Sequence, residues 1–370
     1  MPRARIAAIS HRIRGLLLTA PPVLALDLGG TRIRAAVIQP DGARVARTET
    51  ETPVDDGPAA VVAACVEMLQ RARRSADPGI ADALAGIAVS SPGPVDPRTG
   101  VVVEPPNLGP AFRDVPLTAA ASDALHLPAF LDRDTNVAAL GERAFGAAQG
   151  YDDFIYLTVS TGVGGAIVTG GRLLHGPDGL AGELGHVPVS LDGPRCGCGG
   201  FGHVESYASG AGLAKLARAL VASGGSPFLE ERARSHGDPH RLSAVDVAEG
   251  VKAGDPGCID LMANARRAVA LGCVGYVNAF NPHLIVIGGS IAEAEGESLL
   301  EQVRTTIREE AFQAVARHVS VAAAALGGDV SLAGAHPLVM SRLGETAAPP
   351  STRTRTRQTA SEPVAASPRR

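Results

Sequence analysis

The sequence contains no tryptophan, and aromatic residues make up only 3% of the chain. It also lacks an excess of basic residues, because the formal net charge of −4 gives no general attraction to nucleic acid or to an anionic membrane. No segment approaches the roughly 20 consecutive apolar residues of a membrane span. The apolar patch at 15–19 is also shorter than the core of a signal peptide. We therefore expect neither a nucleic-acid partner nor a membrane partner.

Cysteine is scarce too, with five residues in the whole chain. Cys65, Cys258 and Cys273 stand among apolar residues, where a free thiol usually acts as a small buried hydrophobic side chain. Only Cys196 and Cys198 are close together, so the spacing does not indicate a disulfide framework. A reducing compartment, the cytoplasm, is therefore the expected location.

Length and composition indicate a globular protein with two domains and flexible ends. With 370 residues, 45% of them hydrophobic and 19% charged, the chain is long enough for two hydrophobic cores. The arginine-containing arm at 1–22 is predicted to be a short helix or a flexible leader. The tail at 344–370 is rich in Pro, Ser, Thr and Arg, and we expect it to be disordered because it has little apolar surface to bury.

Two loops rich in glycine and threonine are each expected between two strands. The loops are Gly29-Gly30-Thr31 and residues 160–165, and the strands are expected at 23–28, 32–38, 154–159 and 166–169. Adjacent glycines let backbone N–H groups approach a phosphate closely, because no Cβ atom stands in the way. The first loop alone also fits an ordinary hairpin turn. Two copies favour a pair of hairpins that clamp a nucleotide, although neither copy matches a P-loop or a dinucleotide fingerprint.

Apolar spacing predicts the remaining elements. Helices are expected at 58–75, 117–125, 135–145, 203–220, 256–280 and near 298–312, and buried strands at 84–89, 129–131 and 284–287. Gly288-Gly289 follows the last of these strands and precedes a helix. This arrangement fits the base or ribose side of a nucleotide site and a plain strand-to-helix turn equally well.

Asp134 stands at the junction between a predicted strand and the helix at 135–145. Aspartate is well suited to cap a helix N-terminus, and the local pattern alone favours this role. A carboxylate at the end of a parallel strand is also placed where α/β proteins bind ligands, and it can accept a proton from a substrate hydroxyl. Both roles are open at this point.

Residues 186–205 gather two histidines, two cysteines and a glutamate. The rest of the chain has no comparable density of metal-ligand side chains. Histidine and cysteine are the side chains that hold zinc in proteins, so the segment is a candidate metal site.

Taken together, these residues resemble the ROK family (repressors, open reading frames and kinases), which lies within the actin, heat-shock seventy and sugar-kinase superfamily. The matching segments are DLGGTRIR at 27–34, PGPVD at 92–96, PPNL at 105–108, DTNVAALGE at 134–142, TVSTGVGGAIV at 158–168, ELGH at 183–186, CGCGGFGHVE at 196–205 and NPHLIVIGGS at 281–290. The resemblance implies a duplicated actin-like, ribonuclease-H-like ATPase fold with two α/β lobes and a cleft between them. The lobes are expected at 23–134 and 135–343.

The resemblance also implies a reaction and roles for individual residues. The reaction is phosphorylation of a hexose or N-acetylhexosamine by ATP with Mg²⁺, and Asp134 matches the general base that takes the proton from the sugar hydroxyl. The residues that match sugar contacts or their neighbours are Gly93, Asn107, Asn136, Glu183, His186 and Glu205. The residues expected at the nucleotide are Asp27, Gly29, Gly30, Thr31, Thr161, Gly162, Gly164, Gly165, Gly288 and Gly289.

A structural zinc site is implied as well, and two positions depart from the family pattern. The zinc ligands would be His186, Cys196, Cys198 and His203, with His203 where the family typically has a third cysteine. Arg133 stands where similar glucokinases have an asparagine that hydrogen-bonds the sugar. A guanidinium group only donates hydrogen bonds. The identity of the sugar is therefore open, and the candidates include an acidic or an N-acylated sugar.

Two other functions compete with the kinase. One is a non-catalytic sugar-binding or nucleotide-binding protein, which Arg133 motivates. The other is a sugar-responsive transcriptional regulator, but such relatives carry a helix-turn-helix domain ahead of the first phosphate loop. The twenty-two residues before Val23 are too few for three DNA-binding helices. We therefore expect a kinase, and similar proteins suggest that it forms a homodimer.

Overall fold

The computed structural model describes residues 20–347 of the chain. The predicted arm at 1–22 and the predicted tail therefore lie mostly outside the described residues. Residues 344–347 were assigned to the tail but are helical, because the last helix, α15 (Ala335–Ala347), extends past residue 344. Within the described part of the chain, no helix combines the length and the apolar character needed to cross a bilayer.

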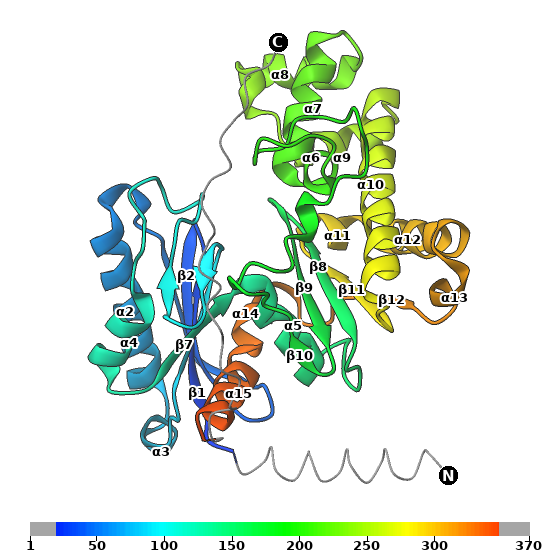
Figure 1. Ribbon diagram of the computed structural model, residues 1–370. Helices are drawn as coiled ribbons and strands as arrows, with labels where there is room; N and C mark the ends of the chain where they lie inside the picture. The colour runs from blue at the N-terminus through cyan, green and yellow to red at the C-terminus, as the bar shows by residue number, and fades with distance from the viewer. Residues whose placement is uncertain (1–19, 348–370) are drawn as a thin grey trace, which may run out of the picture.

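Two five-stranded sheets with the same strand order form the centres of the two lobes (Figure 1). The first sheet has the order β3 (Arg44–Glu51), β2 (Arg32–Ile38), β1 (Val23–Leu28), β4 (Ile87–Ser91) and β7 (Ala129–Arg133). The second has the order β10 (Arg172–Leu173), β9 (Val163–Thr169), β8 (Phe154–Val159), β11 (Leu284–Gly288) and β12 (Ser320–Ala323). In each sheet three antiparallel strands are followed by two parallel ones. This repetition confirms the predicted duplicated fold with two α/β lobes.

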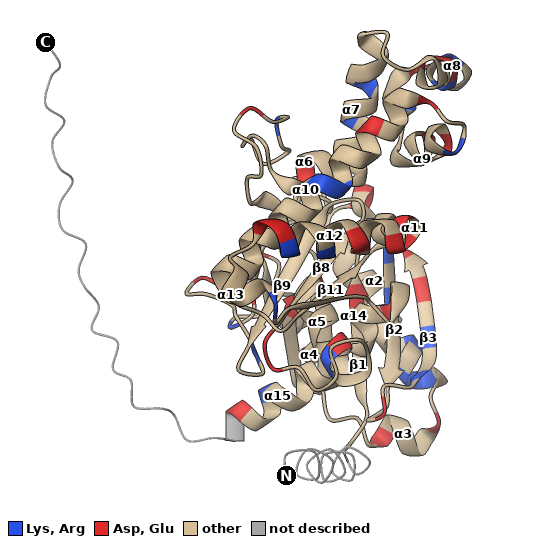
Figure 2. Ribbon diagram, turned by 90° about the vertical axis from the view of Figure 1, so that its right-hand side faces the viewer, with Lys and Arg blue, Asp and Glu red and all other residues tan. Residues whose placement is uncertain are grey.

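Helices cover both sheets. The first lobe carries α2 (Pro58–Ser75), α3 (Pro78–Asp82) and α4 (Leu117–Leu125), together with a small ribbon of β5 (Val95–Asp96) and β6 (Val101–Val102). The second lobe carries α6 (Val204–Ala208), α7 (Gly210–Ala222), α8 (Pro227–His236), α9 (Ala244–Lys252), α10 (Pro256–Phe280), α11 (Ser290–Glu295), α12 (Glu297–Glu310) and α13 (Gln313–Ala316). Short 3-10 helices are η1 (Val54–Asp56), η2 (Leu184–His186), η3 (Pro239–Arg241) and η4 (Gly327–Asp329). Figure 2 shows α8 and α9 at the end of the molecule opposite α15.

The apolar pattern of the sequence explains how α2 packs. Its buried residues Val61, Cys65, Met68, Leu69 and Ala72 recur every three or four positions and so form one face of the helix. That face lies against β1, β2 and β3. β1 is buried along its whole length, as expected for a strand that is covered on both sides.

The end of the chain packs on the first sheet. Leu332 of α14 (Val330–Ala333) and Leu338 and Val339 of α15 share an apolar cluster with Val23 and Ala88 of that sheet. In Figure 1 these two helices lie between the two sheets, next to α5 (Asp134–Phe145). The apolar cluster shows that α14 and α15 contact the first sheet although they come last in the chain. The division of the lobes at residue 134 stays a prediction.

Several predicted elements differ from the structure. The strand expected at 166–169 begins three residues earlier, at Val163 (β9), so Gly164 and Gly165 of the predicted loop lie in the strand. The single helix expected at 203–220 is wrong: α6 and α7 are separate, because the Ser209 hydroxyl accepts a hydrogen bond from Gly212 N at 2.9 Å and starts a new helix. The strand expected at 84–89 lies three residues later at its start, at Ile87–Ser91. The helix near 298–312 is α12, and α11 precedes it.

Glu142 anchors the far end of α5. It is fully buried, and its carboxylate accepts hydrogen bonds from three backbone N–H groups, those of Ala147 at 2.7 Å, Ala325 at 2.9 Å and Leu326 at 3.0 Å. The last two belong to the segment after β12. α5 is therefore tied to the second lobe at one end while its other end begins at Asp134.

Candidate active site

Asp134 lies where β7 of the first sheet meets α5. Asp134 is the first residue of α5, so the cap position belongs to Arg133. The Asp134 Oδ1 atom accepts a hydrogen bond from the backbone N–H of Thr135 at 2.7 Å. Burial, together with the negative charges of Asp27 and Glu183, raises the pKa of Asp134 to about 6, against the opposing effects of Thr135 and Arg133. The carboxylate is therefore ionised at neutral pH but more basic than an ordinary aspartate.

The first glycine loop joins β1 to β2 beside Asp27. Asp27 is 6% exposed, and Arg34 donates two hydrogen bonds to its Oδ2 atom, from Nε at 3.0 Å and from Nη2 at 2.5 Å. A Cβ atom on Gly30 would stand 2.6 Å from the carbonyl oxygen of Asn107. Glycine is therefore required at this position, and Asn107 lies directly against the loop.

The second glycine loop joins β8 to β9 and contacts two other parts of the predicted site. The backbone N–H of Val163 donates to Glu205 Oε2 at 3.0 Å. A Cβ atom on Gly164 would stand 2.8 Å from Thr135 Cγ2, so β9 passes beside the start of α5. The loop thus links the helix that begins at Asp134 to the segment that carries Glu205.

A pocket of about 410 Å³ adjoins the second loop. Ser160 and Thr161 of the loop line it together with Ser290 at the start of α11, and Leu213 and Met262 contribute apolar surface. The hydroxyl oxygens of Ser160 and Ser290 are 2.9 Å apart and hydrogen-bonded. The volume and the mixed lining are typical of a site for a small molecule.

The walls of this pocket could not be predicted from the sequence. They come from α7, α9, α10 and α11, and the short glycine motifs give no signal for helices so far apart in the chain. The Gly288-Gly289 turn was predicted at a nucleotide site and lies just before Ser290 of the pocket. Gly289 has a φ of +95°, and a Cβ atom there would stand 2.6 Å from Thr158 Oγ1, so the turn requires glycine.

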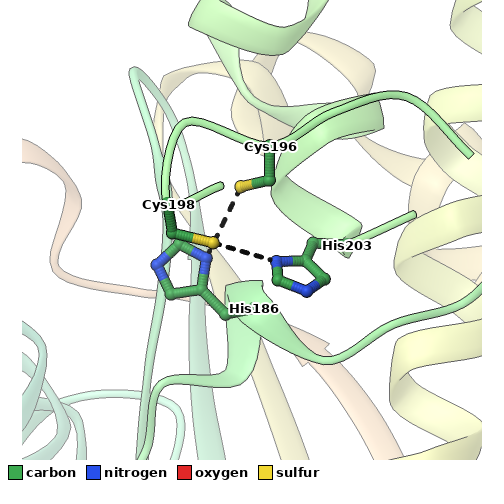
Figure 3. Close-up of side chains that lie close together, drawn as sticks. All are labelled: His186, Cys196, Cys198 and His203. Atoms are coloured by element: carbon green, nitrogen blue, oxygen red, sulfur yellow. Dashed lines mark hydrogen bonds between the residues drawn. The ribbon is translucent and has the colours of Figure 1, made fainter. Parts of the chain in front are cut away.

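The four predicted metal ligands converge (Figure 3). One donor atom from each of His186, Cys196, Cys198 and His203 lies within 4.8 Å of the others. Cys198 Sγ is 3.3 Å from His203 Nδ1, and Cys196 Sγ is 3.6 Å from His186 Nδ1. Ligands around a tetrahedral zinc ion are roughly 3–4 Å apart, because Zn–N and Zn–S bonds are about 2.0 and 2.3 Å long. The donor set therefore fits zinc with a small inward movement.

His186 faces two different environments. Its Nδ1 atom points toward Cys196 of the His/Cys cluster, whereas its Nε2 atom is 4.0 Å from Glu183 Oε2. Tyr276 of α10 supports this segment, because its hydroxyl donates to the carbonyl oxygen of Leu184 in η2 at 2.5 Å. Tyr276 was not among the predicted residues, since an apolar helix position gives no sign of a hydrogen bond to a distant loop.

Arg133 and Asn136 are both buried beside Asp134. The Arg133 guanidinium pairs with Glu183, and Gly93 packs against its side chain: a Cβ atom on Gly93 would stand 3.0 Å from Arg133 Cδ. Asn136 is 1% exposed, and its amide donates to Asp132 Oδ1 at 2.7 Å.

Asp132 is another residue that the sequence did not reveal as part of the site. It is fully buried in β7, and His175 Nε2 lies 2.7 Å from its Oδ2 atom. Burial alone would raise the pKa of Asp132, but the hydrogen bond and charge of His175, together with Asn136, lower it. Because His175 follows β10, this contact joins the end of β7 to the second lobe.

Comparison with known proteins finds a family model that matches residues 23–342, the ROK family. A glucokinase from Thermotoga maritima is 30% identical over 322 residues, 87% of this chain and 98% of the relative. An N-acetylmannosamine kinase from Escherichia coli is 33% identical over 317 residues, 84% of this chain and 96% of the relative. The crystal structure of a ROK family glucokinase from Streptomyces griseus with glucose and AMPPNP has a TM-score of 0.68 at 30% identity and covers 85% of this chain and 97% of that one.

The two sheets of equal strand order, with candidate site residues contributed by both, define a two-lobe α/β protein of the actin-like class. The chain belongs to the ROK family. The family match runs from β1 into α15 and therefore includes both sheets and every residue of the candidate site.

Proposed function

We propose that this protein transfers the γ-phosphoryl group of ATP to a hydroxyl group of a hexose or an N-acetylhexosamine, with Asp134 as general base. The broader activity is that of an ATP-dependent sugar kinase, in line with the glucokinase and N-acetylmannosamine kinase relatives. The finer proposal is carried by the place of Asp134. It begins α5 at the end of β7, the next residue Thr135 packs against Gly164, and its pKa, raised to about 6, reflects in part the charge of Asp27 beside the first glycine loop.

In the proposed reaction the sugar hydroxyl oxygen attacks the γ-phosphorus and its proton passes to the Asp134 carboxylate. The new O–P bond forms as the bond to the β-phosphate oxygen breaks, and ADP leaves with that electron pair. The raised pKa suits this role, because the carboxylate is deprotonated at neutral pH and binds a proton more strongly than an ordinary aspartate does. The proposed sugar contacts are Asn107, Glu183, His186 and Glu205, with Gly93 and Asn136 beside them.

The two glycine loops are the proposed phosphate site, and the pocket of about 410 Å³ next to the second loop is the proposed nucleoside site. The phosphate contacts would be Gly29, Gly30, Thr31, Thr161, Gly162, Gly164 and Gly165. Mg²⁺ also fits, since Arg34 occupies only the Oδ2 atom of Asp27 and carboxylate oxygens are preferred ligands of this cation. When bound, Mg²⁺ neutralises charge on the phosphate oxygens.

The proposed zinc site is structural. Its four protein donors would close the coordination shell, which leaves no position for a substrate. His186 connects the cluster to the proposed sugar site, because one ring nitrogen faces Cys196 and the other faces Glu183. Zinc would thus fix the orientation of a residue that contacts the sugar.

An ADP-release assay with glucose, N-acetylglucosamine and N-acetylmannosamine tests the function. We expect sugar-dependent ADP release with at least one of them, and a product whose mass is greater by one phosphoryl group. Saturable binding of a sugar without turnover of any would instead support the non-catalytic sugar-binding protein. Mass spectrometry of the product excludes ADP release by simple ATP hydrolysis.

Replacing Ala214 of α7 with Phe should raise the KM for ATP while the KM for the sugar changes little. Ala214 lines the pocket next to Ser160 and Thr161, so a phenyl ring would fill space that the nucleoside needs. Steric overpacking typically costs about 1–3 kcal/mol, which corresponds to an increase of roughly ten- to a hundredfold. Ala219 lies on the same helix but is exposed and outside the pocket, so Ala219→Phe is the matched control. An unchanged KM for ATP in Ala214→Phe would place the nucleoside elsewhere.

The homodimer and the cytoplasmic location stay predictions. α10 carries two large apolar residues that are exposed, Ile259 at 41% and Phe280 at 42%, which are candidates for a contact between subunits. Sedimentation of the full chain measures the oligomeric state directly.

A further inference from the structure

Arg133 is buried beneath Glu183 and bonds the first lobe to the second. The residue is 4% exposed, whereas 52% of the Glu183 side chain is exposed. Arg133 Nη1 pairs with Glu183 Oε1, and Nη2 donates to the carbonyl oxygen of Ala181 at 2.5 Å. The guanidinium group at the end of β7 therefore holds both the backbone and the carboxylate of the loop that precedes η2.

The second carboxylate oxygen of Glu183 has a different neighbour. Oε2 lies 4.0 Å from His186 Nε2, and the other ring nitrogen of His186 faces Cys196 Sγ. When Nδ1 serves as a ligand, the ring proton is on Nε2. Glu183 Oε2 and His186 Nε2 then form an acceptor and a donor side by side. Neighbouring hydroxyl groups of a sugar ring can donate to the first and accept from the second.

Arg133 adopts this arrangement although one of its own donors is left without a partner. Among the described residues, the buried side-chain polar atoms without a hydrogen bond are Ser90 Oγ, Arg133 Nε and Asn136 Oδ1. All three lie around the end of β7, because Ser90 is on the neighbouring strand β4 and Asn136 is in the first turn of α5. Buried polar groups without partners are rare, and their concentration at one place is typical of a functional constraint.

We propose that Arg133 is a positioning residue for Glu183. Its guanidinium group holds the Oε1 atom of Glu183, so that the Oε2 atom faces the sugar next to His186. This inference rests on the proposed sugar kinase function. Two glycines make room for the guanidinium, since a Cβ atom on Gly93 would stand 3.0 Å from Arg133 Cδ and one on Gly182 would stand 2.8 Å from Nη2.

The charges around the site define the class of sugar. The positive charges of Arg133 and Arg34 are already paired with Glu183 and Asp27, and the carboxylates of Asp134 and Glu205 add further negative charge to the same site. A uronic or other acidic sugar would meet net negative charge there, which is unfavourable. The substrate is therefore a neutral hexose or N-acetylhexosamine with two neighbouring free hydroxyl groups.

Arg133 also affects the general base. The charged groups that face Asp134 are Asp27 from β1, Glu183 from the loop before η2, and Arg133 from β7, whose positive charge lowers the pKa of Asp134. Loss of that charge therefore moves the acid side of the pH profile of kcat/KM toward higher pH. A side chain with only a packing role would not produce this shift.

A double-mutant cycle with Arg133→Met and Glu183→Gln tests the inference on the sugar that the wild-type enzyme phosphorylates. We expect Arg133→Met to raise the KM for the sugar by about tenfold or more, with an unchanged KM for ATP. Because Arg133 acts through Glu183, the double variant should bind the sugar no more weakly than Glu183→Gln alone. Arg133→Lys keeps the charge but loses the fork of donors, so its pH profile should stay near that of the wild type while its KM rises. Arg308→Met, which removes an arginine that is 63% exposed, is the control.

The outcomes separate this inference from the proposed function. Suppose that the wild type turns over a sugar. An unchanged KM for that sugar in Arg133→Met, or fully additive effects in the cycle, then overturns the positioning role and leaves the kinase proposal intact. If the wild type turns over no sugar, the kinase proposal fails, and the cycle is measured by calorimetric titration with glucose and N-acetylmannosamine. Absence of both turnover and binding overturns both proposals. Arg133→Lys gives the comparison if Arg133→Met does not fold.

Discussion

Replacing Asp134 with Asn is expected to lower kcat by about a hundred- to ten-thousandfold, the usual contribution of a general base. Asparagine has nearly the same shape and retains an oxygen that can accept from Thr135 N, but its amide cannot take the proton of a sugar hydroxyl. The affinity for ATP should change little, because the proposed nucleotide contacts lie on the glycine loops and in the pocket beside α7. The kcat is measured by ADP release, and the affinity by calorimetric titration with a non-hydrolysable ATP analogue.

The pH dependence provides a second test of the same residue. With a pKa of about 6, Asp134 is protonated at lower pH, so kcat/KM of the wild type should fall roughly tenfold per unit below pH 6 and level off above pH 7. The Asn variant should lack this slope in its residual activity. Activity within a few fold of the wild type would show that another group accepts the proton.

Stability provides the control for correct folding of the Asn variant. The folded-state pKa of Asp134 is raised above its unfolded value, so folding favours the protonated carboxyl group. That contribution is present below the unfolded pKa, near 3.9, and is lost as the pH rises through about 6. At pH 8 the neutral Asn avoids the buried charge, and its thermal midpoint should equal or exceed that of the wild type. Lost activity with an unchanged midpoint therefore reflects chemistry.

Much of the fold was predictable because its elements carry local signals. α2, α4 and α10 have the predicted bounds, since each combines periodic apolar residues with a clear start or stop. β3 has no counterpart among the predictions, because RVARTETE contains few apolar residues and only its pairing with β2 makes it a strand. The return of α15 to the first sheet is likewise a long-range contact that no local pattern encodes.

The candidate site was predictable only where a short motif holds its residues. The sequence reveals the glycine loops, the Cys196 and Cys198 pair and Asp134, because the spacing of these residues along the chain is distinctive. It does not reveal the partners that position them: Tyr276 supports η2 from α10, and His175 reaches Asp132 from the other lobe. These contacts join residues more than forty positions apart: the first depends on packing within the second lobe, and the second depends on how the two lobes meet.

Replacing Cys196 with Ser is expected to remove zinc from the purified protein and to weaken sugar binding. Cys196 is 4% exposed, and its Sγ atom is 3.6 Å both from His186 Nδ1 and from Glu205 Oε1. Without the metal, His186 loses the partner that orients its ring, and Glu205 loses a fixed neighbour. We expect about one zinc per chain in the wild type and almost none in the variant, with a KM for the sugar that rises about tenfold or more.

The KM for ATP separates a local effect of zinc from general unfolding. The glycine loops and the nucleoside pocket contain none of the four proposed metal ligands, so ATP binding should persist in Cys196→Ser as long as the lobes stay folded. Cys65→Ala is the matched control, because Cys65 is a fully buried thiol of α2 in the other lobe. It should lower the thermal midpoint slightly and leave both the zinc content and the KM for the sugar unchanged. Wild-type protein that is free of zinc and fully active would remove the structural role of the metal, and His203 in place of the usual cysteine would then mark a site that this chain no longer uses.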